Sequence, residues 1–361
     1  MDKVRKEFPV TRKNIYANTA VFGPLYDSLI DWRQEHDLDF LLHGSEMREK
    51  SLRLLSDTRK TVGLFFNCKR ENVALVNNFS TGLNVLLEGL HSKKKILLLE
   101  NDYPSVNWSF ENRGFDISYL KPSSVIEERI EETIASQNID VLALSIVQWL
   151  DGFFIDLDFI KKLKRTYPNL IIIADGTQFC GSMEFDFDAS GIDVLGASAY
   201  KWLLAGYGNG FMLFSDRVKE EFSVSSIGFN AANGDFDKKG TIRFAKKFEP
   251  GHLSCLNFGS LKFSMEFMQK VGVDKITKHN KLLSEKAKQE FNSLGLLEDR
   301  IVVRKEHSTI FNIKANTSIF NKLLEKDVLC AQRGDGVRLS FHFYNTEDEI
   351  DAIVRILKTV L

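Results

Sequence analysis

Cysteine and proline are scarce in this sequence, and neither sign of charge dominates it. Only four cysteines (Cys68, Cys180, Cys255 and Cys330) and six prolines occur in 361 residues. The cysteines lie far apart and form no C-x-x-C pair, which excludes a disulfide framework and the common zinc-finger spacings. The formal net charge of −1 argues against a strongly basic protein that binds nucleic acid.

Long apolar runs are also missing. No stretch reaches the length of about 18 apolar residues that a membrane-spanning helix needs. The first residues are charged and contain no apolar core of a signal peptide, so we expect a cytoplasmic protein that binds no membrane. The composition, 43% hydrophobic and 27% charged, is typical of soluble globular proteins. The length predicts about two domains, and the 29 phenylalanines indicate a large aromatic core.

Short apolar segments alternate with helical patterns between residues 73 and 214. The predicted strands are Val73–Asn77, Lys95–Leu99, Ile117–Leu120, Val141–Val147, Leu170–Ala174, Val194–Ala197 and Gly210–Phe214. The predicted helices between them are Ser80–Leu90, Val106–Arg113, Val125–Gln137 and Leu157–Tyr167. This alternation predicts an α/β fold with a mainly parallel seven-stranded sheet flanked by helices. The last strand is expected to run antiparallel at or near an edge.

The pattern changes after Pro250. Two long helical patterns come first, and short strand candidates and a final helix that opens with a Thr346–Glu349 capping box follow. We therefore predict a large α/β domain at 17–250 and a small α+β domain at 251–361, with residues 1–16 packed on the small one. The helical patterns are Asn257–Val271, Ile276–Leu294 and Ile350–Leu361, and the strand candidates are Ile301–Val303, Thr309–Ile313 and Val337–Phe343.

Three polar features follow strands of the predicted sheet. Asp175 comes directly after one strand, Lys201 lies shortly after the next, and Ser80 opens a helix. Ligands of open α/β sheets bind beyond the carboxyl ends of the strands, and a helix start favours an anion. Pyridoxal 5'-phosphate (PLP) needs a lysine, a carboxylate and a phosphate site, so this set predicts that cofactor. Taken singly, each residue is ordinary: a turn aspartate, a solvated lysine or a helix cap.

The same segments resemble the class V aminotransferase and cysteine desulfurase group of fold-type I PLP enzymes. The resemblance extends from Ile15 to Leu361 and includes Asp102-Tyr-Pro-Ser105, Asp175-Gly-Thr-Gln178 and Ser198-Ala-Tyr-Lys201. It implies that Lys201 binds the cofactor covalently, that Asp175 pairs with the ring nitrogen and that Gln178 contacts the phenolic oxygen. Tyr103 would stack on the ring. The phosphate would be held by Phe79, Ser80, Ser198 and Tyr200.

Two further segments extend the resemblance into the C-terminal part. In Phe248-Glu-Pro-Gly-His252, histidine stands where the family has a threonine that reaches the partner subunit's cofactor phosphate. This substitution puts the contact by His252 in doubt. Val337-Arg-Leu-Ser340 contains Arg338, which by resemblance binds the substrate carboxylate. The resemblance also implies a homodimer with sites at the subunit interface.

The sequence departs from the desulfurases at one point. Those enzymes carry a nucleophilic cysteine on a mobile loop before the strand of the final arginine, whereas here Arg333-Gly-Asp-Gly336 joins directly to that strand. Cys330 lies upstream, where a structural role is the stronger interpretation. Trp149 stands near the substrate side, where shaping the pocket and filling the core are equally good interpretations.

We therefore predict a class V aminotransferase that moves an amino group from a small amino acid to a keto acid through a Schiff base at Lys201. Arg338 would hold the carboxylate, and Lys201 would act as base. A PLP-dependent lyase, an epimerase, and a cysteine desulfurase or selenocysteine lyase-like enzyme remain alternatives on the same site. A non-catalytic member of the fold is the remaining alternative, and the presence of Asp175, Lys201 and Arg338 argues against it.

Overall fold

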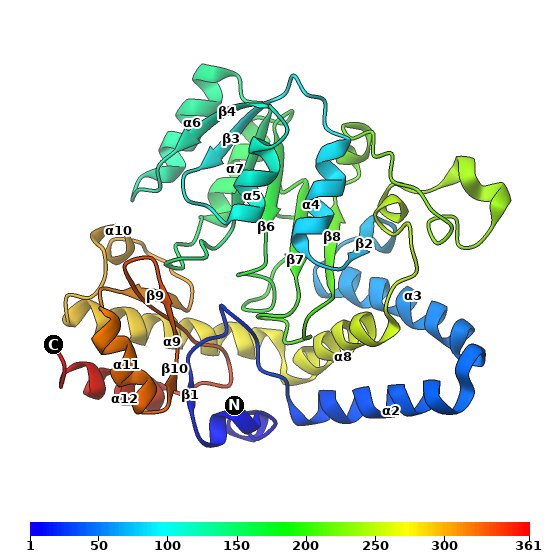
Figure 1. Cartoon of the computed structure of the whole chain (residues 1–361). Helices are drawn as coiled ribbons and strands as arrows, with labels where there is room; N and C mark the ends of the chain where they lie inside the picture. The colour runs from blue at the N-terminus through cyan, green and yellow to red at the C-terminus, as the bar shows by residue number, and fades with distance from the viewer.

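A seven-stranded sheet forms the centre of the larger part of the molecule (Figure 1). The computed structural model describes residues 1–361 apart from the side chain of Asp2. The strand order is β2-β8-β7-β6-β5-β3-β4, and β8 alone in this sheet is antiparallel to its neighbours. The predicted mainly parallel sheet and the antiparallel last strand near an edge are confirmed. The strands are β2 (Val73–Val76), β3 (Lys95–Leu99), β4 (Asp116–Leu120), β5 (Val141–Ser145), β6 (Ile171–Asp175), β7 (Val194–Ser198) and β8 (Gly210–Phe214).

Both faces of this sheet are buried, which explains why its strands are almost uniformly apolar. In β6, Ile171 and Ile173 pack with one hydrophobic cluster, and Ile172 and Ala174 pack with the other. Residues of α4 (Phe79–Glu88) and α5 (Pro104–Glu111) belong to the first cluster. Residues of α3 (Met47–Phe65), α6 (Ile126–Gln137), α7 (Leu157–Thr166) and α8 (Cys255–Val271) belong to the second. The sheet is therefore the middle of three layers.

A three-stranded antiparallel sheet, in the order β11-β12-β9, organises the C-terminal part. The long helix α9 (Val273–Ser293) precedes this sheet in the chain. Helix α12 follows it and begins with the predicted capping box of Thr346 and Glu349. The remaining elements are α10 (Asp299–Val302), β9 (Ile310–Ile313), α11 (Thr317–Glu325), β10 (Val328–Leu329), β11 (Ala331–Arg333), β12 (Gly336–Ser340) and α12 (Glu347–Leu357).

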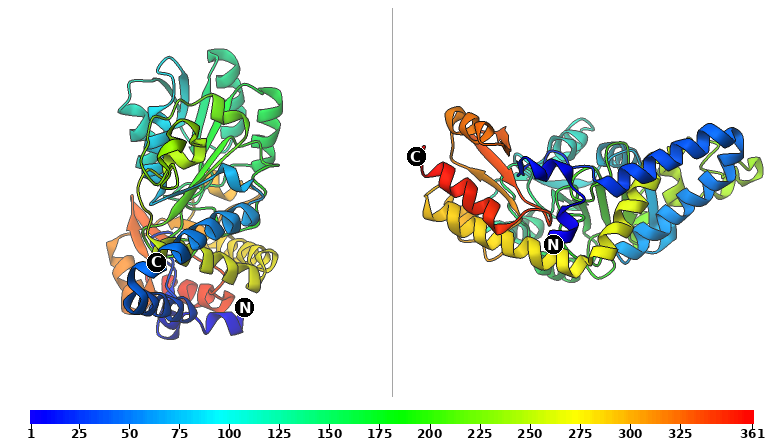
Figure 2. Two further views of the ribbon diagram at one scale, coloured as in Figure 1. Left: turned by 90° about the vertical axis from the view of Figure 1, so that its right-hand side faces the viewer. Right: turned by 90° about the horizontal axis from the view of Figure 1, so that it is seen from below.

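The N-terminal residues lie against this C-terminal part. Strand β1 (Ile15–Tyr16) pairs in parallel with β10, and the Arg5 guanidinium donates to Glu349 at 2.6 Å. Helix α1 (Asp2–Arg5) precedes β1, and α2 (Asp27–His43) follows it. Helices α2 and α3 form an arm that projects from the body (Figure 2). The division at 250/251 stays a prediction, and α8, the first helix after it, packs on α3, where the Thr58 hydroxyl donates to the Phe258 carbonyl.

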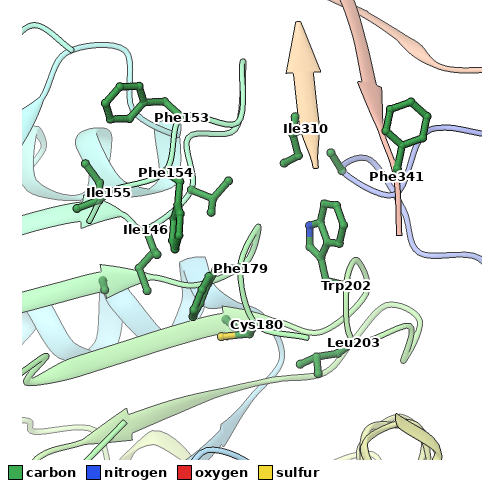
Figure 3. Packing of buried hydrophobic residues seen from close by; sticks show 14 of the residues in the cluster. Ile146, Phe153, Phe154, Ile155, Phe179, Cys180, Trp202, Leu203, Ile310 and Phe341 are labelled. Atoms are coloured by element: carbon green, nitrogen blue, oxygen red, sulfur yellow. The ribbon is translucent and has the colours of Figure 1, made fainter. Parts of the chain in front are cut away.

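Trp202 lies where the two sheets meet. Its ring, from the loop between β7 and β8, points toward Ile310 and Phe341 of the C-terminal part (Figure 3). The Trp202 indole N–H donates to Gln178 Oε1 at 2.8 Å, and its carbonyl lies 3.0 Å from His342 Nε2. Since Gln178 follows β6 and His342 follows β12, this fully buried residue connects the large sheet to the small one.

The sequence-based prediction of a strand at Ile301–Val303 is wrong. These residues overlap helix α10 (Asp299–Val302), in which the Ile301 N–H donates to the Glu298 carbonyl. A run of three apolar residues does not distinguish a strand from one buried helical turn. Helices α2, α3 and α11 had no sequence prediction. In α2 the apolar residues Leu38, Leu41 and Leu42 are exposed, so the usual helical periodicity is missing.

Six 3₁₀ helices complete the chain: η1 (Pro9–Arg12), η2 (Gly44–Glu46), η3 (Arg70–Asn72), η4 (Arg217–Glu220), η5 (Phe236–Thr241) and η6 (Phe244–Phe248). Among the described residues, every helix is too short or too polar to cross a membrane.

Candidate active site

The carboxyl ends of β3, β5, β6 and β7 converge on one small cavity. Asp175 is the last residue of β6, and Lys201 follows β7 by three residues. Tyr103 follows β3, and Trp149 follows β5. The cavity is lined by Tyr103, Ser145, Val147, Trp149, Asp175, Thr177, Gln178 and Lys201. Residues that the sequence predicted for the ring, the imine and the substrate thus meet at one edge of the sheet, as expected for open α/β folds.

Lys201 is 5% exposed and lies between two aromatic rings. Its Nζ is 5.6 Å from the ring centre of Tyr103 and 5.5 Å from that of Tyr200. Burial lowers the pKa of the Lys201 amine to about 7; Asp175 opposes this shift, and Arg338 and Arg333 add to it. A lysine in these surroundings is partly neutral near pH 7, as a nucleophile or a general base requires.

Asp175 is equally buried. Its Oδ1 accepts the Thr177 N–H at 2.8 Å. Burial raises the pKa of the Asp175 carboxyl to about 6, and nearby Asp102 adds to the rise, while Thr177 and Lys201 oppose it. A cationic partner at this carboxylate would stabilise its ionised form, because opposite charges at short range favour ionisation.

Asp102 is a second buried carboxylate, to which the sequence prediction gave no role. Its Oδ1 accepts the Tyr103 N–H and the Ser145 hydroxyl, each at 2.6 Å, and its Oδ2 accepts the Ser145 N–H at 2.8 Å. Burial raises the pKa of Asp102. The carboxylate therefore ties Tyr103 to the end of β5. In the sequence, the position of Asp102 directly before Tyr103, the residue predicted to stack on the cofactor ring, is the feature that could have indicated this role.

Small polar groups surround the start of helix α4. Ser198 Oγ accepts the Phe79 N–H at 2.9 Å, and the hydroxyl oxygens of Ser80 and Ser105 are 2.6 Å apart. The Asn78 side chain caps the helix by accepting the Thr81 N–H. Gly210 leaves room for this arrangement, since a Cβ there would meet the Ala197 carbonyl oxygen at 2.5 Å. Serine hydroxyls at a helix start suit an anionic group.

The Gln178 side chain is held from two sides. Its Nε2 donates to the Ala20 carbonyl at 3.0 Å, and its Oε1 accepts the Trp202 indole N–H. The second N–H of this amide has no partner among the described residues. The predicted contact between Gln178 and the cofactor stays a prediction.

Arg338 is a buried cation that no acidic side chain pairs with. It stands on β12, is 3% exposed and donates one N–H to the Trp149 carbonyl. No carboxylate of the described side chains forms an ion pair with it, and its Nε has no hydrogen-bond partner. Burial lowers the pKa of Arg338 to about 10, and Arg333 adds to the shift. An unpaired guanidinium beside the cavity is a site for a carboxylate.

His252, predicted to bind the cofactor, and Cys330, for which a structural role was preferred, both lie apart from the cavity. His252 is exposed and borders a separate hollow with Phe40, Arg48 and Phe229. Cys330 is 7% exposed at the junction of β10 and β11. Residues 334–335 form a tight turn between β11 and β12, so the segment before Arg338 is a short hairpin. Trp149 is half-buried, its ring centre lies 6.1 Å from that of Tyr103, and it borders the cavity.

Comparisons with known proteins agree with this fold. The profile of the "Aminotransferase class-V" family matches residues 42–353. A probable cysteine desulfurase of Methanothermobacter thermautotrophicus is 23% identical, over 99% of this chain and 98% of its own. The uncharacterised aminotransferase YcbU of Bacillus subtilis is 22% identical, over 97% of this chain and 95% of its own.

Solved structures share the fold at lower identity. A cysteine desulfurase from Thermococcus onnurineus superposes with a TM-score of 0.87 at 17% identity, covering 99% of this chain and 97% of its own. The cystine C–S lyase C-DES, solved with its product cysteine persulfide, has a TM-score of 0.87 at 18% identity, covering 97% of this chain and 98% of its own.

The fold is therefore that of a fold-type I PLP enzyme. The chain belongs to the class V aminotransferase family, and its cofactor is PLP. The residues present fit that group. A buried lysine and a buried aspartate face one cavity, and hydroxyl groups surround the nearby helix start. The unpartnered Nε of Arg338 leaves a donor for a substrate.

Asp102→Asn tests the electrostatic part of this site. The change keeps the shape of the side chain and removes one buried negative charge. Loss of that charge disfavours the protonated form of nearby groups and so lowers their pKa. We expect the pH midpoint of the absorbance change of the bound cofactor to fall by about one unit. Ser145→Ala is the matched control, because it removes a hydrogen bond to the same carboxylate and keeps the charge. Equal midpoints in wild type and Asp102→Asn would contradict the expectation.

Proposed function

We propose that this chain is a PLP-dependent carbon–sulfur lyase for small amino acids. In this proposal the enzyme breaks a Cβ–S bond, and no cysteine of the chain accepts the sulfur. One observation carries the proposal: Lys201 lines a cavity that none of the four cysteines lines, and the unpaired Arg338 adjoins this cavity through its bond to the Trp149 carbonyl. The relatives named as desulfurases and the C–S lyase fold support a sulfur-containing substrate.

Arg338 would bind the substrate α-carboxylate. Its planar guanidinium can donate two parallel N–H bonds to one carboxylate, which fixes both the position and the orientation of the amino acid. Burial strengthens this contact, because the surrounding dielectric is low. The hydrogen bond to the Trp149 carbonyl would hold the Arg338 guanidinium in place. Trp149, which lines the cavity, would border the substrate side chain.

Lys201 would remove the Cα proton. Its lowered pKa provides a neutral amine, and its position between Tyr103 and Tyr200 limits access of water. When bound, PLP supplies an electron-withdrawing ring that stabilises negative charge at Cα. Asp175 would hold the ring nitrogen protonated, and Gln178 and Tyr103 would position the ring. The phosphate would be held by Phe79, Ser80, Ser198 and Tyr200.

The bond balance of the reaction needs no sulfur-accepting thiol. The Cα proton goes to Lys201, the Cβ–S electron pair leaves with the sulfur, and water converts the remaining fragment to a keto acid and ammonia. A persulfide relay would need a thiolate at the site. Burial instead raises the pKa of Cys330 to about 12 and that of the fully buried Cys180 well above its usual value.

Transamination of a small amino acid is the second candidate. The same arrangement of Arg338 and Lys201 would serve it, since carboxylate binding and Cα deprotonation begin both reactions. The relatives named as uncharacterised aminotransferases favour this alternative.

An amino-acid screen without keto acid separates the two reactions. With L-cysteine we expect pyruvate, ammonia and hydrogen sulfide over many turnovers, and with L-cystine pyruvate, ammonia and cysteine persulfide, whereas a transaminase stops after one stoichiometric conversion of its cofactor. Arg338→Gln should raise KM about a hundredfold, because a charged hydrogen-bonded pair is lost. Cys330→Ser is the matched control and should keep full activity. Loss of turnover in Cys330→Ser would overturn the absence of a protein thiol from the reaction.

The pH profile follows from the pKa values of the buried pair. Lys201 must be neutral to accept a proton, and Asp175 must be ionised to pair with the ring nitrogen. Both requirements are met as the pH rises through about 6 to 7. We therefore expect kcat, which reports the substrate complex in which the Lys201 amine is free, to increase across this interval and then to level off. A maximum below pH 6 would exclude Lys201 as the base.

We also infer that two chains associate. Apolar side chains are strongly exposed on the α2–α3 arm and the nearby loop, including Leu41, Leu42 and Phe236, and His252 borders a hollow on this side together with Phe40 and Phe229. Exposed apolar surface of this kind marks a protein interface. Light scattering should give twice the mass of one chain, and Leu41→Glu with Leu42→Glu should reduce it. A monomer at micromolar concentration would contradict the inference.

A further inference from the structure

The turn that follows β5 carries Trp149 and is held by residues of the C-terminal part. We call residues 148–152 the Trp149 turn, and the Gln148 carbonyl closes it by accepting the Gly152 N–H at 2.9 Å. Trp149 lines the catalytic cavity, and its carbonyl accepts an N–H of Arg338. Since this is the hydrogen bond that the described residues offer the Arg338 side chain, the position of the turn decides where that guanidinium lies.

An ion pair joins the Trp149 turn to helix α10. The Arg300 guanidinium lies 2.5 Å from Asp151 Oδ2, and Asp151 Oδ1 accepts the Phe153 N–H at 3.0 Å. One carboxylate oxygen therefore braces the turn from within, and the other connects it to the C-terminal part. The side chains of Arg300 and Asp151 are 27% and 11% exposed, so little water competes for this pair.

A second arginine holds the chain as it leaves the Trp149 turn. Arg304 donates to the Phe154 carbonyl at 2.8 Å, and its guanidinium lies 4.5 Å from the ring centre of Phe153. Both carboxylate oxygens of Glu127 in α6 accept N–H groups of Arg304, at 2.5 and 2.8 Å. The guanidinium of Arg304 is thus paired with an anion of its own, which leaves the Asp151 carboxylate to Arg300.

The backbone of the Trp149 turn also lies close against β9. Gly152 has a φ of +76°, and a Cβ there would lie 2.1 Å from the Ile310 carbonyl oxygen, so this contact requires glycine. The Ser308 hydroxyl donates to the Gly152 carbonyl at 2.8 Å. Charge, hydrogen bonding and close packing from the C-terminal part therefore all act on one short turn.

From these contacts we propose that Arg300 and Asp151 are positioning residues of the catalytic cavity. They hold the Trp149 turn, whose carbonyl fixes the Arg338 guanidinium, and Arg338 receives the substrate carboxylate. Neither Arg300 nor Asp151 lines the cavity, so both act through Trp149. A small displacement of a binding group costs much of its effect. The inference rests on the proposed role of Arg338, and its test separates the two.

A rapid-mixing absorbance titration of the cofactor-loaded protein with L-alanine tests the proposal. L-Alanine carries the α-carboxylate but no Cβ–S bond, so the change in cofactor absorbance reports amino-acid binding without lyase turnover. We expect Arg300→Gln and Asp151→Asn each to raise the apparent Kd about tenfold. Arg300→Lys, which keeps the charge of the pair, should restore most of the affinity. Asp151→Asn keeps the side-chain shape and leaves Arg300 paired with Glu298 at 2.7 Å.

A double-mutant cycle with Arg338→Gln distinguishes positioning from general stabilisation. If Arg300 acts through Arg338, Arg300→Gln costs no further affinity once the Arg338 guanidinium is removed, so the two effects are not additive. Arg5→Gln is the matched control. The side chains of the Arg5–Glu349 pair are 23% and 9% exposed, close to the values of the Arg300–Asp151 pair, and neither residue lines the cavity. This variant should lower Tm and leave Kd unchanged.

Each remaining outcome counts against the inference. An unchanged Kd in Arg300→Gln and Asp151→Asn, or additive losses in the double variant, would reduce the pair to a structural contact and leave the proposed function intact. An equal loss of affinity in Arg5→Gln would show that binding follows stability alone. An unchanged Kd in Arg338→Gln, or no saturable binding in the wild type, would instead contradict the carboxylate-binding role of Arg338 and with it both proposals.

Discussion

The site depends on charges that are buried without forming direct ion pairs with one another. Lys201, Asp175 and Arg338 are each at least 95% buried, and only long-range attraction and repulsion connect them. Burial brings the pKa values of Lys201 and Asp175 within about one unit of each other, near neutrality. An unpaired buried charge is costly unless a ligand compensates it. In the proposed function, the cofactor and the substrate carboxylate compensate these charges.

Hydrogen bonds from the rest of the fold hold the residues around these charges in place. Asp102 links Tyr103 to Ser145, and Gln178 links Ala20 to Trp202. The contacts to Ser145, Ala20 and Trp202 join residues that are 43, 158 and 24 positions apart in the sequence. Trp202 contacts His342 of the C-terminal part and Gln178 of the cavity, and Arg338 of β12 contacts Trp149, so two buried contacts join the C-terminal part to the site.

The proposed reaction class rests on the absence of cysteine from the residues that line the cavity. The family supports several chemistries on one arrangement of lysine, aspartate and arginine, because the early steps are shared and later groups decide the outcome. In this chain a two-residue turn replaces any loop before Arg338, and the cysteines are buried or distant. The positions of the cysteines thus bear on sulfur chemistry more directly than their number does.

The sequence by itself determined the seven strands of the large sheet and the residues that follow them, because buried parallel strands are short apolar runs and the polar residues after them are conspicuous. It did not determine the helices of the α2–α3 arm, several of whose apolar residues face solvent, or α10, whose Ile301 and Val302 read together with the next residue, Val303, equally well as a strand. Only the tertiary structure decided that Arg338 lacks a counter-ion and that Asp102 accepts hydrogen bonds from Ser145. These facts depend on which distant segments meet, and burial and pairing are properties of such meetings, not of local sequence.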